Sequence, residues 1–157
     1  MKKVILAAAF TLLAFYPKTA LLAHCEIPCG IYDDHMRIAM IEENIATIEK
    51  GMRQIVELSA QGEKNYNQIV RWTMNKDQHA DELQHIVTQY FMTQRITPAS
   101  PADGDKYQDY QNKLELLHNM LVSAMKAKQT TDLSHVEKLR ALMADFSKAY
   151  FGEEHKH

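Results

Sequence analysis

Both cysteines of the chain lie in one short segment near its start, HCEIPCGIYDD (residues 24–34). His24 directly precedes Cys25, and Cys29 follows with three residues between the two thiols. A disulfide would close so small a loop that it would be strained and would remove little entropy from the unfolded chain. A thiol redox motif more usually has two intervening residues. A metal site is the third interpretation, and it also accounts for the histidine.

The donor atoms of this segment favour a particular metal. With residue 24 as a free N-terminus, the segment offers the α-amine and imidazole of His24, the amide nitrogen of Cys25 and two thiolates. The amine, the amide nitrogen and the sulfurs can lie in a plane around one ion, with the imidazole at an axial position. Such ligation suits Ni(II) or Cu(II), whereas zinc prefers a tetrahedron. Because thiolates tend to reduce Cu(II), we favour nickel, and strong anionic donors would let it cycle between Ni(II) and Ni(III).

A removable leader would expose that amine. Lys2 and Lys3 precede an apolar run (residues 4–16), and a patch of small residues ends at Ala23. This is the layout of a secretory signal peptide, and the run is shorter than the roughly 20 residues that span a bilayer. We expect residues 1–23 to be removed and the protein to be periplasmic or extracellular, with no stable membrane span after cleavage. Leu21 fits a signal-peptidase site poorly, so the alternative is a cytoplasmic protein cut by a dedicated processing protease.

The rest of the chain is predicted to form helices. Apolar residues recur at steps of three and four in three segments, which places each set on one helix face: Ile38, Ile41, Ile45, Ile48, Met52 and Ile55; Tyr107, Tyr110, Leu114, Leu117, Leu121 and Ala124; and Val136, Leu139, Met143, Phe146 and Tyr150. A further helix, at about residues 66–93, has a less regular seam that Lys76 and His79 interrupt.

Turn and capping residues separate these segments. Asp33 and Asp34 can cap the first helix, and Ser134 and Glu137 have the spacing of a capping box at the start of the last. We therefore predict an all-α, antiparallel four-helix bundle within residues 24–157, with a metal-binding hook at residues 24–32. The chain carries 18 basic and 20 acidic residues without a basic patch, so no nucleic-acid partner is expected.

The hook resembles that of a known family. The pattern His24-Cys25-x-x-Pro28-Cys29-Gly30-x-Tyr32 is similar to the nickel hook of the nickel superoxide dismutases, and the bundle resembles theirs. The resemblance implies conversion of superoxide, a small-molecule substrate, to dioxygen and hydrogen peroxide. It implies nickel ligation by His24, Cys25 and Cys29, with Tyr32 beside the open axial face, and a homohexamer in which each hook lies against a neighbouring subunit.

Other positions are assigned supporting roles. Pro28 and Gly30 make the tight turn of the hook, and Glu26, often aspartate in relatives, lies on an exposed turn. Some relatives brace the axial histidine with an acid early in the first helix and an arginine on the second. Here residues 37–39 offer no acid, and His79 stands where the arginine is expected; it either contacts the hook region or is a hydrogen-bonded core histidine. Tyr90 is either a second tyrosine near the site or a core residue.

The sequence also suggests two rival functions. A di-iron bundle uses Glu-x-x-His pairs, and the chain has Glu82 with His85 and Glu115 with His118. Each pair lies one step away from the inward positions of its helix, so we expect these side chains to face solvent. The remaining alternative is an exported helical bundle that binds or delivers a metal without catalysis.

Overall fold

The computed structural model describes residues 30–152; residues 1–29 and 153–157 lie outside the described part. The chain divides into two units, Met1–Tyr32 and Asp33–His157. The second contains four long helices: α2 (Asp34–Ser59), α3 (Tyr66–His85), α4 (Asp105–Gln129) and α5 (Ser134–Phe151). A π-helical segment (Ile86–Arg95) continues α3, and short 3-10 turns lie at Glu63–Asn65 and Pro101–Asp103.

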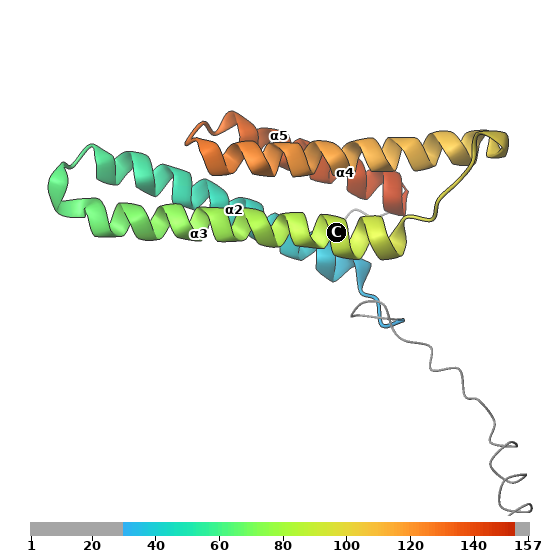
Figure 1. The fold of residues 1–157 in the computed structure, drawn as a ribbon, viewed down its shortest axis with the longest axis horizontal. Coiled ribbons are helices and arrows are strands. Elements are labelled where there is room, and N and C mark those ends of the chain that lie inside the picture. The colour runs from blue at the N-terminus through green and yellow to red at the C-terminus, as the bar shows by residue number, and fades with distance from the viewer. Residues whose placement is uncertain (1–29, 153–157) are drawn as a thin grey trace, which may run out of the picture. The chain divides into compact units, whose positions relative to one another are not determined.

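The four helices form the predicted antiparallel bundle (Figure 1). α2 packs against α3 and α4 against α5, while contacts of α3 with α4 and of α2 with α5 close the bundle. No strand occurs within residues 30–152, so the predicted fold class is confirmed there. None of the helices in this part of the chain has both the length and the apolar character needed to cross a membrane.

The predicted seams form the core. Their buried members include Ile41, Ile45, Ile48, Met52, Leu117, Ala124, Val136, Leu139 and Phe146, nearly all with no exposed surface. Full burial of one aliphatic or aromatic side chain contributes about 1.5–3 kcal/mol. The heptad-like spacing therefore identifies both the helices and the faces that hold them together.

The first helix begins as the sequence predicts. Asp33 is the N-cap residue of α2, and its Oδ1 accepts a hydrogen bond from the backbone N–H of Met36 at 2.9 Å. Asp34 is already inside the helix, in its first turn, where a negative charge is stabilised by the helix dipole. Its carboxylate makes other contacts, which are described below.

The capping box predicted at the last helix is wrong. α5 begins at Ser134, but Leu133 occupies the N-cap position and makes no side-chain cap. Asp132 Oδ1 instead accepts the hydrogen bond from the backbone N–H of Ser134 at 2.9 Å. Asp132 therefore satisfies this N–H group. Ser134 is the first residue of the helix, one position after the N-cap, and so does not serve as the cap.

Lys76, which interrupts the seam of α3, is fully inside the bundle, with 2% of its surface exposed. Its Nζ donates hydrogen bonds to the carbonyls of Ala127 and Lys128, at 2.8 and 2.7 Å, and to Asp77 Oδ1 at 2.8 Å. Gly51 on α2 makes room, because a Cβ there would lie 3.1 Å from Lys76 Cβ. The lysine thus ties α3 to the C-terminal end of α4, where carbonyls lack helical partners.

The hydrogen-bond register of the backbone changes at the end of α3. Ile96 N–H bonds to the carbonyl of Phe91, five residues earlier, at 2.9 Å, in keeping with the π-helical segment that precedes it. In an α-helix residues five apart point roughly 140° away from each other. A π-helix bonds i to i+5 and so stacks such residues. Tyr90 and Arg95 therefore lie on the same side of this segment, which decides the geometry of the cluster described next.

Candidate metal centre and its support in the bundle

The predicted metal ligands, His24, Cys25 and Cys29, lie outside the described residues, as do Glu26 and Pro28. Their assignment stays a prediction. The chemistry of the donor set fits nickel, because amine, amide nitrogen and thiolate are ligands of square-planar Ni(II). Among residues 30–152, no three His, Cys, Asp or Glu side chains come together in a way that could hold a metal ion.

Two predicted site residues fall at the beginning of the described chain. Gly30 has a φ of +77°, the left-handed conformation that glycine adopts at little cost. A Cβ at position 30 would meet nothing within 4 Å, so lack of space is not the reason for a glycine. The positive φ is the reason. Tyr32, two residues later, has 39% of its surface exposed. A side chain at position 30 would therefore strain the backbone directly after Cys29.

A cluster of hydrogen bonds surrounds Asp34, the first residue of α2. Asp34 Oδ1 accepts from the hydroxyl of Tyr90 at 2.6 Å and from Nε of Arg95 at 2.8 Å. Its Oδ2 accepts from Nη2 of Arg95 at 2.7 Å and from the hydroxyl of Tyr150 at 2.9 Å. We call these four residues the Asp34 cluster. It joins the start of α2 to the π-helical segment and to α5, and its arginine is bidentate, the geometry that fixes a carboxylate most firmly.

The electrostatics of the cluster follow from these contacts. Burial acts to raise the pKa of Asp34, but the hydrogen bonds from Arg95, Tyr90 and Tyr150 outweigh it, and the pKa lies below its usual value. Burial and the bond to Asp34 raise the pKa of Tyr90 to about 12 and also raise the pKa of Tyr150. Asp34 is thus held as a carboxylate and both tyrosines as phenols over the neutral range.

Tyr90 is buried, as a seam residue should be, and its ring also lies under a cation. Cζ of Arg37 is 4.9 Å from the centre of the Tyr90 ring, a distance typical of a cation–π contact. Only 4% of Tyr90 is exposed. Tyr90 is therefore a core residue, and its place near the metal site stays a prediction, because residues 24–29 lie outside the described part of the chain.

His79 is placed elsewhere on the bundle. Its Nδ1 lies 2.6 Å from Oδ1 of Asn44 and 3.6 Å from Oε2 of Glu82, and the ring is half-buried between α2 and α3. Asn44 follows Asp34 by ten residues on α2, roughly 15 Å along the helix axis. The structure therefore brings His79 to Asn44 and does not bring it into the Asp34 cluster.

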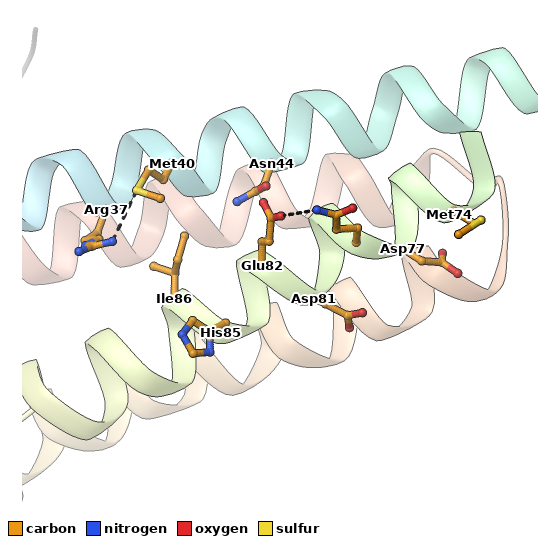
Figure 2. A pocket seen from close by; sticks show the side chains of 10 residues that line it. Arg37, Met40, Asn44, Met74, Asp77, Asp81, Glu82, His85 and Ile86 are labelled. Carbon is orange, nitrogen blue, oxygen red and sulfur yellow. Dashed lines mark hydrogen bonds between the residues drawn. The ribbon is translucent and has the colours of Figure 1, made fainter. Parts of the chain in front are cut away.

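A cavity of about 800 Å³ lies between α2 and α3 (Figure 2). Figure 2 shows Arg37 and Met40 on α2, and Asp81 and His85 on α3. Arg37 Nη1 donates a hydrogen bond to Met40 Sδ at 3.7 Å. Asp81 is paired with Lys128 at 2.6 Å. The cavity combines apolar and charged walls, and its acids do not converge on one point.

The Glu-x-x-His pairs of the di-iron alternative are on the solvent side. Glu82, His85, Glu115 and His118 are all exposed. The prediction that they face solvent is confirmed. Each lies one position away from a seam residue, of which Leu83, Ile86 and Leu117 are buried and Leu114 is partly buried.

Sequence reasoning missed the Asp34 cluster. It treated Asp34 only as a helix cap, Tyr150 only as a seam residue, and did not consider Arg95. One signal was available: a tyrosine hydroxyl inside a bundle needs a hydrogen-bond partner, and Tyr90 and Tyr150 therefore each required one. The spacing of five between Tyr90 and Arg95 gave no help, because α-helical periodicity places these residues on different faces.

The chain is similar to a known protein family. The model of a family described as nickel-containing superoxide dismutase matches residues 19–154. That range includes the hook segment and the whole bundle. No curated protein matches the chain, and no solved structure does.

Proposed function

The chain belongs to the family of nickel-containing superoxide dismutases, and on that premise we propose that residues 24–32 form its nickel hook. The protein is an oxidoreductase with a nickel cofactor and superoxide as its substrate. Two superoxide anions and two protons give one dioxygen and one hydrogen peroxide, so one superoxide is oxidised and the other reduced. A metal-delivery role without catalysis is not favoured, because the matching family is one of enzymes.

The family match carries this proposal, together with the donor set. His24 would bind nickel through its α-amine and imidazole, Cys25 through its amide nitrogen and thiolate, and Cys29 through its thiolate. When bound, nickel supplies the one-electron redox chemistry, alternating between Ni(II) and Ni(III). Deprotonated nitrogen and sulfur donors favour that alternation because they stabilise the higher charge.

The other hook residues shape access to the metal. The hydroxyl of Tyr32 would order water and limit the approach of other anions, and backbone N–H groups of the hook would donate hydrogen bonds to the bound substrate. Pro28 and Gly30 would set the turn between the ligands, and Glu26 would lie on its exposed side. Tyr90 supports the site indirectly, through Asp34, whereas His79 supports the packing of α2 on α3 through Asn44.

The amine ligand requires processing of the chain. We propose that residues 1–23 are a leader, that cleavage after Ala23 exposes His24, and that residues 24–157 are the mature enzyme. Export to the periplasm or the extracellular space is the preferred location, and a cytoplasmic enzyme cut by a dedicated protease is the alternative. A homohexamer is proposed from the family resemblance alone.

The test is a reconstitution of the mature chain. The chain from His24 to His157 is prepared with a free N-terminus and loaded with nickel, and the decay of superoxide is followed after pulse radiolysis. We expect catalysis in this chain and its loss in Cys25→Ser and Cys29→Ser, with unchanged helicity by circular dichroism, because the helices of the described bundle begin only at Asp34. Full activity in either variant would remove that cysteine from the ligand set.

A further inference from the structure

The position of Asp34 limits where the hook can lie. Asp34 is the first residue of α2, Tyr32 precedes it by two residues, and Cys29 precedes it by five. Even a fully extended chain spans only about 7 Å over two residues and about 18 Å over five. Whatever holds Asp34 in place therefore restricts the positions open to Tyr32 and Cys29.

Asp34 is held more firmly than the start of a helix requires. Asp33 already caps α2, and one cap is the usual means of satisfying a first turn that otherwise lacks partners. Four further hydrogen bonds reach Asp34 from outside α2: two from Arg95 and one each from Tyr90 and Tyr150. They come from two other elements, so the first turn of α2 is fixed against the rest of the bundle.

A second observation points the same way. Tyr90 and Arg95 reach the same carboxylate because the chain from Ile86 to Arg95 is π-helical. π-helical segments are rare, and they occur frequently at functional sites. Hydrophobic packing alone would be served by a continuing α-helix, which would turn Arg95 away from Asp34. The π-helical register is therefore explained by the hydrogen bonds that it lets Tyr90 and Arg95 donate to Asp34.

We propose that Asp34 is a positioning residue for the nickel hook, an inference that rests on the function proposed above. Together with Tyr90, Arg95 and Tyr150 it fixes the start of α2. The segment that carries Tyr32 and the predicted metal ligands is joined in the sequence directly to this fixed start. Asp34 itself touches neither metal nor substrate in this account.

The chain offers a matched control in Glu49. This residue also lies on α2, accepts hydrogen bonds from Arg53 at 2.9 and 2.7 Å, and pairs with Arg140 of α5. Its position is fifteen residues after Asp34, roughly 22 Å along the helix. Glu49→Gln and Asp34→Asn therefore both weaken a contact between α2 and α5, but only Asp34→Asn acts next to the hook.

Amide hydrogen exchange in the nickel-free mature chain tests the geometric half of the proposal. We expect Asp34→Asn to speed exchange of the amides of Met36 and Arg37, which donate hydrogen bonds to Asp33 in the first turn of α2, by roughly 10- to 100-fold, the effect of losing charge-assisted hydrogen bonds locally. Glu49→Gln should leave exchange of these residues unchanged. Tyr150→Phe, which removes one hydroxyl and keeps the ring, should give a smaller increase and covers the case in which Asp34→Asn fails to fold.

Release of nickel to a chelator tests the functional half. The loaded Asp34→Asn chain should lose nickel at least several times faster than wild type, and the Glu49→Gln chain at the wild-type rate. Equal exchange in Asp34→Asn and wild type, or equal nickel loss in both variants, would overturn the positioning role and leave the dismutase function standing. A wild-type mature chain that binds no nickel would overturn the proposed function and the positioning role together.

Discussion

Replacement of Lys76 by methionine tests how the bundle is held closed. Methionine keeps the length and the apolar stem of the side chain but removes the amino group. That group is buried and donates hydrogen bonds to the carbonyls of Ala127 and Lys128 and to Asp77. The change therefore breaks the link between α3 and the end of α4 without opening a cavity.

The structure gives the size of the effect. Ala127 and Lys128 lie at the C-terminal end of α4, where carbonyls have no helical donor. A buried acceptor left without a partner costs about 1–3 kcal/mol. The carbonyls of Ala127 and Lys128 both lose their donor, but methionine offsets part of this cost because it buries no charge. Asp77, whose side chain is 41% exposed, regains water. We expect a net loss of about 2–3 kcal/mol, which lowers Tm by about 10 °C for a chain of this size.

The assay is thermal unfolding followed by circular dichroism at neutral pH. Lys128→Met is the control, because Lys128 pairs with Asp81 at 2.6 Å on the surface, where an ion pair contributes at most about 1 kcal/mol. Lys76→Met should unfold well below this control. If the two variants unfold at the same temperature, the contacts of Lys76 with α4 do not stabilise the bundle, and the reasoning is refuted.

Further predictions concern pH and the N-terminus. Because the pKa of Asp34 is lowered in the folded state, its contribution is fully present above about pH 4, its unfolded range, and disappears as pH falls through the folded value. The stability difference between wild type and Asp34→Asn in urea titrations should therefore be constant near neutrality and shrink in acid; a constant difference at all pH values would contradict this. At the alkaline end, the pKa of Tyr90 is raised to about 12, so stability should fall between about pH 10 and 12, and less in Tyr90→Phe. One extra residue before His24 turns the amine ligand into an amide and should abolish dismutase activity with helicity unchanged; an active extended chain would show that the amine is not required.

The sequence predicts the bundle well because its information is periodic. Residues such as Ile41 and Ile45, or Leu139 and Phe146, repeat at the helical spacing, and this spacing specifies the helices and their buried faces. The capping prediction at Ser134 failed for a local reason, since an acid two residues upstream satisfied the same N–H group. The spacing of residues in the sequence does not show which of two neighbouring side chains will accept a given hydrogen bond.

The support around Asp34 could not be predicted in the same way. It depends on a π-helical register between Ile86 and Arg95, and a change of register leaves no mark in a pattern of apolar residues. Lys76 shows the complementary difficulty. A lysine within a seam suggests an interruption, yet its long side chain reaches the carbonyls at the end of another helix. The Asp34 cluster depends on where α2 begins, and the contacts of Lys76 depend on where α4 ends. Helix ends are the least predictable part of a fold.

The hook is the part of the chain for which sequence remains the main guide. The types and order of its proposed ligands and their place directly after a proposed leader suggest nickel, and the family match spans the same segment. The structure adds an observation on the bundle itself: the cluster around Asp34 fixes the start of α2, the helix that follows residues 24–32 in the sequence.

Intact mass and metal content of the protein purified from its native host test whether it is a processed nickel enzyme. We expect a chain that begins at His24 and carries one nickel ion. A chain that retains residues before His24, or one that carries zinc or iron in place of nickel, would contradict it.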